Sequence, residues 1–86
     1  MKLRYHRTFQ KQVVKLKPAE VKRLKEALEL FMVDPNDPNL YDHSLFGEWK
    51  GHRSISFGGD WRAHYIVIGQ DIVLFVAAGT HSQLYK

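Results

Sequence analysis

The sequence predicts an α+β domain in which a helical hairpin packs on a small, mainly antiparallel sheet. Two stretches between residues 8 and 33 repeat their apolar residues with helical spacing, which indicates two consecutive helices. Three apolar or alternating stretches between residues 53 and 78 are separated by tight-turn signals, which indicates a strand meander. One alternating stretch precedes the helices, so the expected order is β-α-α-β-β-β. A chain of 86 residues has room for one hydrophobic core, and we expect residues 1–86 to form a single domain.

The chain begins with a predicted strand and a short helix. Residues 2–6 alternate polar and apolar side chains, as a strand with one buried face does. Thr8 is the expected N-cap of the helix, which should end near Leu16. The apolar residues with helical spacing in this segment are Phe9, Val13 and Leu16.

The second predicted helix is amphipathic and runs from Pro18 to about Val33. Proline suits the first turn of a helix, where its missing N–H group is not needed. The apolar stripe of this helix consists of Val21, Leu24, Leu28 and Phe31. Two prolines and two aspartates within residues 34–38 are expected to end it.

Residues 39–50 have no regular period and are expected to form a loop anchored by aromatic side chains. Strand patterns follow at Arg53–Phe57, Trp61–Ile68 and Ile72–Ala78. The glycine-containing segments 58–60 and 69–71 between them are turn signals. Because the last run is apolar throughout, we expect a central strand covered on both faces, which Gly79 then breaks. The first strand is expected to join the edge or the centre of this meander.

Positive charge is concentrated in the first part of the chain. Residues 1–25 contain nine Lys or Arg and one acid, whereas residues 26–86 contain four bases and eight acids. Such an asymmetry is typical of a surface that binds a polyanion, and nucleic acid is the usual polyanion. A solvated, lysine-rich helix face would give the same pattern. The candidate RNA-binding residues on the predicted helices are Lys11, Lys15, Lys22, Arg23 and Lys25.

Several classes of protein are disfavoured by composition. The chain has no cysteine, so it has neither a disulfide framework nor a thiolate metal site. No apolar stretch approaches the roughly 18 residues that a membrane span needs. Charged residues follow the first methionine where a signal peptide would have its apolar core. We therefore expect a cytoplasmic protein.

The five histidines are the principal candidates for chemistry. His43 and His81 lie in polar, turn-rich segments, where an imidazole stays accessible and exchanges protons near neutral pH. His6 and His52 are expected at the ends of strands, and His64 is expected to be a hydrogen-bonded histidine inside the core. No recognised metal-ligand spacing, nucleophile elbow or glycine-rich phosphate loop is present. We therefore expect no metal and no cofactor.

Two accessible histidines, a nearby carboxylate and a basic surface suit the metal-free cleavage of RNA. RNA carries its own nucleophile, the 2′-hydroxyl group, which attacks the adjacent phosphate once its proton is removed. General acid–base groups typically accelerate such steps by ~10²–10⁴-fold each. Cationic side chains stabilise the charge on the phosphorane. Aromatic residues such as Trp61 and Tyr85 are suited to stacking on unpaired bases.

Three sequence blocks occur in a characteristic order. They are Asp42–Leu45 followed by Gly47–Arg53, then the pair Asp60-Trp61, then Gly79–Tyr85. Together they resemble the YafQ-type branch of the RelE/ParE toxin superfamily, and the resemblance covers nearly the whole chain. It implies a RelE-like fold and a type II toxin that enters the ribosomal A site and cleaves mRNA. It also implies a cognate antitoxin that holds the toxin inactive. The oligomeric state does not follow from the resemblance.

The resemblance implies roles for individual residues of this chain. His43 and His81 correspond to the acid–base histidines of the family, and Asp60 to a catalytic or orienting carboxylate. Trp61 corresponds to a structural or substrate-contacting aromatic residue, and Tyr85 takes the place of the usual terminal phenylalanine.

Two positions depart from the pattern of the family. Ser56 stands where a third histidine is usual, and Ala77 stands where an arginine is common. Arg53 and Arg62 are then the candidates to supply a cation to the substrate. Three alternatives stay open at this point: a weakened homologue that binds antitoxin or ribosome, a ParE-like topoisomerase inhibitor, and a basic RNA-binding domain with no toxin role.

Overall fold

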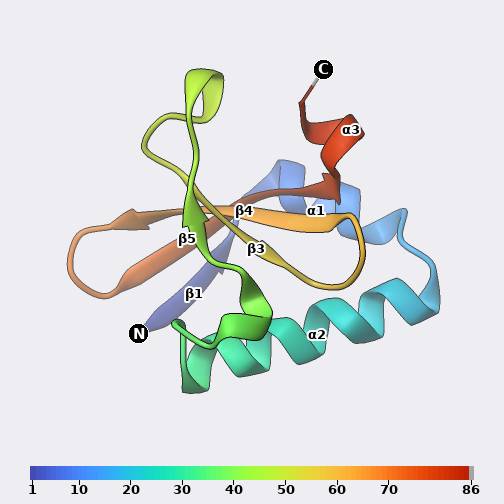
Figure 1. The fold of residues 1–86 in the computed structure, drawn as a ribbon, viewed down its shortest axis with the longest axis horizontal. Coiled ribbons are helices and arrows are strands. Elements are labelled where there is room, and N and C mark those ends of the chain that lie inside the picture. The colour runs from blue at the N-terminus through green and yellow to red at the C-terminus, as the bar shows by residue number, and fades with distance from the viewer. Residues whose placement is uncertain (86) are drawn as a thin grey trace.

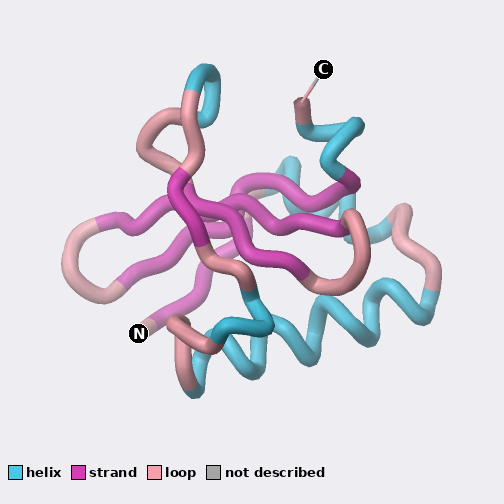
Figure 2. The backbone as a smooth tube through the Cα atoms, viewed as in Figure 1, coloured by secondary structure: helices cyan, strands magenta, loops and turns pink. Residues whose placement is uncertain are grey.

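The structure, a computed structural model, describes residues 1–85. Its strands and helices follow the predicted order, with an additional strand between the second helix and the meander and an additional short helix after the last strand (Figure 1). The strands are β1 (Lys2–Tyr5), β2 (His43–Ser44), β3 (Arg53–Ser56), β4 (Trp61–Ile68) and β5 (Ile72–Thr80). The helices are α1 (Arg7–Val14), α2 (Pro18–Val33) and α3 (His81–Leu84), with two 3-10 turns, η1 (Pro38–Leu40) and η2 (Gly47–Trp49). Figure 2 shows the strands as one continuous layer.

The five strands form one sheet in the order β1-β5-β4-β3-β2. Strand β1 pairs with β5 in parallel and lies at one edge, whereas the other neighbours pair antiparallel. The predicted α+β class and the mainly antiparallel sheet are thus confirmed. The prediction of an unbroken loop over residues 39–50 is wrong, because β2 pairs with β3 through His43 and Ser44. Two residues are too few for a strand period to appear in the sequence.

The start of α1 differs from the prediction. His6, not Thr8, is the N-cap, since its Nδ1 accepts a hydrogen bond of 3.1 Å from the backbone N–H of Thr8. The helix then ends at Val14, two residues before Leu16. The bounds predicted for α2 are confirmed, and Glu20 Oε1 accepts a 2.9 Å hydrogen bond from the N–H of Lys17. The negative charge of an acidic residue in the first turn also interacts favourably with the helix dipole.

The hydrophobic core lies between the sheet and the two long helices. Phe75 at the centre of β5 is fully buried and meets Phe31 of α2 edge to face, with ring centroids 5.7 Å apart. Phe31 also meets Tyr65 of β4 at 5.1 Å. Full burial of a side chain of this size contributes roughly 1.5–3 kcal/mol. These contacts fix one face of the sheet against the helices and leave the other face to η2 and α3, which rise from the side opposite α2 (Figure 1).

Gly79 does not break the last strand, contrary to prediction. Strand β5 continues through it to Thr80, and α3 begins at His81. A Cβ atom at position 79 would lie 2.8 Å from Oε1 of Gln83, so a side chain at this position would displace the Gln83 amide from the strand. In that position Gln83 Oε1 accepts a 2.9 Å hydrogen bond from the N–H of Thr80, while the Thr80 hydroxyl accepts one from the N–H of Gln83. Gly79 therefore leaves room for the capping interactions that start α3.

The two turns predicted from glycine are present. Gly58, Gly59 and Gly69 all have positive φ angles, which side chains disfavour. The N–H of Trp61 donates a 2.9 Å hydrogen bond to the carbonyl of Gly58 and closes the first turn. Among residues 1–85, no helix is both long and apolar enough to cross a membrane.

Candidate active-site face

A row of four residues crosses the face of the sheet that the long helices leave free. His43 of β2 pairs with Ser54 of β3, Ser54 pairs with His64 of β4, and His64 pairs with Ala77 of β5. Directly paired residues place their side chains on the same face of a sheet. We call the side of the sheet on which these four side chains lie the histidine face.

A second row lies beside the first, one pleat along the strands. It consists of Ser56, Arg62 and Gly79, which are again direct partners. Nη1 of Arg62 donates hydrogen bonds to the hydroxyl of Ser56 at 3.3 Å, and to the carbonyls of Gly59 at 2.9 Å and Trp61 at 3.1 Å. The guanidinium group is therefore held in place next to His64.

His64 lies at the centre of the histidine face and is fully buried. The ring of Trp49 stands nearly perpendicular to it at 4.4 Å, and the ring of Tyr85 lies 5.5 Å away. Burial, followed by the charges of His52, His43, Arg62 and His81, lowers the pKa of His64 to about 4. The imidazole is consequently neutral at physiological pH.

The prediction for His64 is only half right. The residue is buried, but its Nδ1 has no hydrogen-bond partner within residues 1–85. Its Nε2 lies 3.5 Å from the hydroxyl of Tyr85, at the outer limit of a hydrogen bond. In the sequence, His64 lies between Ala63 and Tyr65 in a strand that is otherwise apolar. The sequence therefore gives no sign that His64 points away from the helices.

His43 is exposed at the edge of the histidine face. It belongs to β2, so the prediction that it lies outside regular strands is wrong. Its Nδ1 lies 2.8 Å from the carbonyl oxygen of Tyr41, which only accepts hydrogen bonds, and so Nδ1 carries the proton. Nε2 is therefore the free, basic nitrogen, and it is held in one tautomer.

His81 is exposed as the first residue of α3. The prediction of an irregular turn is wrong here too, because the capping interactions of Thr80 start a helical turn. The imidazole lies 4.5 Å from the ring of Tyr85. The backbone N–H of His81 donates a 3.2 Å hydrogen bond to the carbonyl of Asp60. Asp60 thus reaches His81 through its main chain, and within residues 1–85 its carboxylate makes no hydrogen bond or ion pair.

Trp61 and Arg53, both predicted to bind substrate, lie on the other face of the sheet. The ring of Trp61 packs on Phe57 at 5.8 Å and against the core. Arg53 Nε donates to Asp42 Oδ1 at 2.8 Å, and this hydrogen bond is the main cause that raises the pKa of Arg53. The structure therefore brings His43, Arg62, His81 and Tyr85 together around His64, and it does not bring Trp61 or Arg53 to them.

Trp49 is a member of the histidine face that was not among the predicted site residues, although it lies in the Gly47–Arg53 block. Its ring covers both His64 and His52, which lies 5.4 Å away. Its indole N–H donates a 3.3 Å hydrogen bond to the carbonyl of Leu84, so it joins η2 to α3. The available signal was its place in that block, within a loop expected to be anchored by aromatic side chains.

The basic residues predicted to bind RNA are all exposed on α1, α2 and the turn between them. Two of them lie close to residues of the sheet or of its turns. Lys15 lines a hollow together with Gln83 and Trp61. Arg23 lies against the β3–β4 turn, since its Cδ is 3.0 Å from the position of a Cβ at Gly58.

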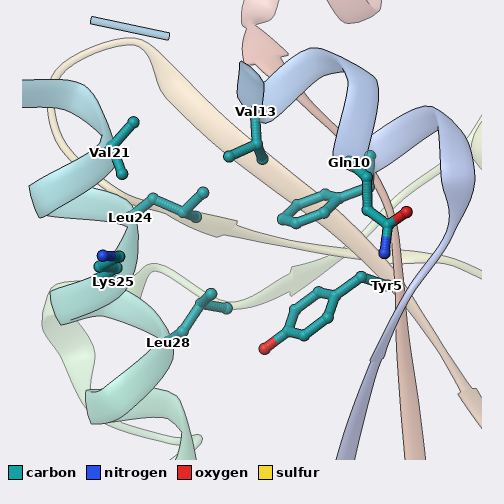
Figure 3. Close-up of a pocket in the computed structure, with 8 residues that line it drawn as sticks. Tyr5, Gln10, Val13, Val21, Leu24, Lys25 and Leu28 are labelled. Carbon is teal, nitrogen blue, oxygen red and sulfur yellow. The ribbon is translucent and has the colours of Figure 1, made fainter. Parts of the chain in front are cut away.

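An apolar groove of about 350 Å³ lies on the helix side of the molecule (Figure 3). Val13 of α1 faces Leu24 and Leu28 of α2 across it, and Tyr5 of β1 forms its floor (Figure 3). This groove is separate from the histidine face. Across residues 1–85, no group of three or more His, Asp or Glu side chains is arranged to hold a metal ion.

Comparison with known proteins agrees with this geometry. Residues 1–86 match the protein family described as the bacterial toxin of type II toxin-antitoxin system, YafQ. The crystal structure of YafQ from Escherichia coli strain BL21(DE3) is 25% identical, with a TM-score of 0.83 over 99% of this chain and 98% of that one. YafQ in the E. coli DinJ-YafQ toxin-antitoxin complex is 26% identical, with a TM-score of 0.81 over 99% and 97% of the chains.

A more distant structure shares the fold alone. The YoeB/ParE toxin from Agrobacterium tumefaciens is 16% identical, with a TM-score of 0.78 over 94% of this chain and 99% of that one. A search of curated proteins finds no match.

Proposed function

We propose that this chain, which belongs to the YafQ family of bacterial type II toxin–antitoxin toxins, is a ribosome-dependent mRNA endonuclease. The observation that carries the proposal is the convergence of His43, Arg62, His81 and Tyr85 around His64 on one face of the sheet. All the charged groups that act on His64 are basic, as a site for a phosphodiester requires.

The chemistry that we propose needs no metal ion. His43 is suited to be the general base, because its Nε2 is free and its Nδ1–H is held by the carbonyl of Tyr41. It takes the proton of the 2′-hydroxyl, and the 2′-oxygen attacks the adjacent phosphorus. The bond from phosphorus to the 5′-oxygen then breaks, and protonated His81 gives its proton to that oxygen. The products are a 2′,3′-cyclic phosphate and a 5′-hydroxyl end.

Arg62 is suited to stabilise the charge of the phosphorane. Its guanidinium group is fixed by three hydrogen bonds before substrate arrives, so little reorganisation is needed. It supplies a cation on the histidine face where β5 has Ala77. The ring of Tyr85 is placed to stack on a base beside the scissile bond.

The remaining predicted residues take supporting roles in this proposal. Asp60 orients His81 through its peptide carbonyl. The exposed basic residues of α1 and α2 are suited to contact ribosomal RNA. A cognate antitoxin is the expected partner, since YafQ of E. coli is found in complex with DinJ.

A second candidate function is a binding module that has lost cleavage. It is favoured by Ser56 and Ala77, two small side chains that lie in the two rows of the histidine face. Such a protein would occupy the ribosome or an antitoxin without cutting mRNA. A ParE-like action on a topoisomerase is less well supported, because it gives no role to the ordered histidines.

Cell-free translation separates these functions. Wild-type protein is added to a translating extract, and new mRNA ends are mapped by primer extension. We expect ribosome-dependent ends that disappear with His81→Ala, and growth arrest in cells that this substitution relieves. His6→Asn, which keeps the N-cap of α1, is the matched control and should cleave normally. Ribosome binding without new ends would instead support the binding module.

A further inference from the structure

The side chains of His64 and Tyr85 connect the centre of the histidine face with the C-terminal end of α3. The Tyr85 hydroxyl lies 3.5 Å from Nε2 of His64, while its ring lies 4.5 Å from the imidazole of His81. Tyr85 therefore touches a buried histidine with its hydroxyl and an exposed one with its ring. Catalytic hydrogen bonds are often long in free enzymes and tighten when substrate binds.

Core packing alone does not explain a histidine at position 64. A buried donor or acceptor without a partner costs about 1–3 kcal/mol, which an aliphatic residue of similar volume would avoid. The buried side-chain atoms without partners in residues 1–85 are Nδ1 of His52, the hydroxyl of Ser54 and Nδ1 of His64. All three belong to the histidine face or its border with Trp49. Buried polar groups without partners occur at catalytic sites and at sites that hold a water molecule or an ion.

Burial and the nearby basic groups keep His64 uncharged. After burial, the groups that lower its pKa are His52 before β3, His43 on β2, Arg62 on β4 and His81 on α3, while its partner on β5 is the uncharged Ala77. Burial also raises the pKa of Tyr85, so the phenol keeps its proton. The phenol donates to Nε2 in the neutral tautomer of His64 that carries its proton on Nδ1.

We propose that His64 is a positioning residue, whose Nε2 accepts a hydrogen bond from the Tyr85 hydroxyl and so holds the Tyr85 ring against His81. This inference rests on the proposed nuclease function for its catalytic meaning. His64 moves no proton itself. It fixes the phenol, and through the phenol it fixes the imidazole that protonates the leaving oxygen. Trp49 covers His64 and keeps water from competing for Nε2.

Substitutions at position 64 test this role, because they differ in how far the side-chain amide reaches. In His64→Gln the terminal amide reaches the place of Nε2, so it can accept from Tyr85. In His64→Asn the amide reaches only the place of Nδ1, and Tyr85 is left without an acceptor. We expect cleavage within about threefold of wild type for His64→Gln and about tenfold slower for His64→Asn and for Tyr85→Phe. The losses should fall on kcat, with KM little changed.

A double-substitution cycle measures whether the effects of the two substitutions on cleavage depend on each other, which a purely structural role of His64 would not predict. If the hydrogen bond is the active element, His64→Asn combined with Tyr85→Phe should be no slower than the slower single variant. Equal activity of the Gln and Asn variants, or losses that multiply in the double variant, would overturn the proposal.

The positioning claim is also measurable without cleavage. NMR cross-peaks between the rings of Tyr85 and His81 should be present in wild type and His64→Gln, and absent in His64→Asn. If wild type shows this pattern but cuts no mRNA, the positioning claim stands and the nuclease proposal fails. If the cross-peaks persist in His64→Asn, the positioning claim fails whatever the activity.

Discussion

The backbone N–H of His81 donates a 3.2 Å hydrogen bond to the carbonyl oxygen of Asp60, and so joins the start of α3 to the β3–β4 turn. These two residues are 21 positions apart and belong to two of the sequence blocks that identify the family. A main-chain contact fixes where α3 leaves the sheet regardless of the side chain at position 60. The direction of the His81 imidazole is therefore set by backbone geometry and refined by Tyr85.

Replacing Arg62 with lysine should abolish most of the cleavage activity. A lysine carries the charge on one nitrogen only, whereas Arg62 makes its hydrogen bonds to Ser56, Gly59 and Trp61 through Nη1 and keeps a second terminal nitrogen, Nη2, to donate to a phosphate. We expect kcat for ribosome-dependent cleavage to fall by about 10²–10³-fold. Arg53→Lys is the matched control on the opposite face and should leave the rate within about threefold of wild type. A larger loss of cleavage activity for Arg53→Lys than for Arg62→Lys would contradict the proposal that the phosphate binds on the histidine face.

The stability of the protein should decrease in mild acid because of His64. The unfolded chain takes up a proton at this residue near pH 6.5, whereas the native state does so only near pH 4. Its contribution is therefore complete above about pH 6.5 and is lost as the pH falls towards 4, by up to ~3 kcal/mol. Urea unfolding at pH 7 and pH 4.5 should show a larger fall in the free energy of unfolding for wild type than for His64→Gln. Equal falls in both proteins would show that His64 is not the group responsible.

Gly79→Ala should loosen α3 while leaving the core intact. The new methyl group would displace the Gln83 side chain and break its hydrogen bond to Thr80, at a cost of about 1 kcal/mol. We expect faster hydrogen exchange in residues 80–84 and weaker cleavage, with little change in global unfolding. Because both changes remove the same cap, Gln83→Ala should add little to Gly79→Ala. Fully additive effects would mean that the methyl group acts on something other than Gln83.

Removing a central aromatic side chain should destabilise the whole fold. Phe75→Ala deletes a fully buried ring that contacts Phe31 and Tyr65, and such substitutions cost about 3–5 kcal/mol. Val33→Ala, at a position 84% exposed, is the control and should change the free energy of unfolding by less than about 0.5 kcal/mol. Chemical denaturation of both variants measures the difference.

The long elements were predictable from the sequence because their periods are strong. The apolar stripe of α2 and the uniform apolar run of β5 both identify elements longer than one turn or pleat. The short ones were not: β2 has two residues, and α3 has four. At that length a strand or helix is created by partners elsewhere in the chain, such as Ser54 for His43. Gly79 was misread for the same reason, since its need for space comes from Gln83.

Candidate-site residues that belong to sequence motifs could be predicted. Which face of the sheet each strand residue occupies was harder to predict. His43 and His81 were selected from the sequence blocks; His43 lies in the same row of paired residues as His64, and His81 lies against the ring of Tyr85. His64 was assigned to the core because its neighbours are apolar. The pairing register decides its direction, and register is not visible in a single strand. Trp61 and Arg53 face the other way for the same reason.

The parallel pairing of β1 with β5 has a consequence for how this protein is made. Lys2 aligns with Ile72, so the first strand waits for a partner 70 residues later in the chain. Contacts of such long sequence separation form late, because a large loop must close before they are gained. Phe75, Ala77 and His81 arrive on the same stretch of chain, so the core and the histidine face are completed in one step. A growing chain that still lacks β5 therefore has neither a stable fold nor an assembled site.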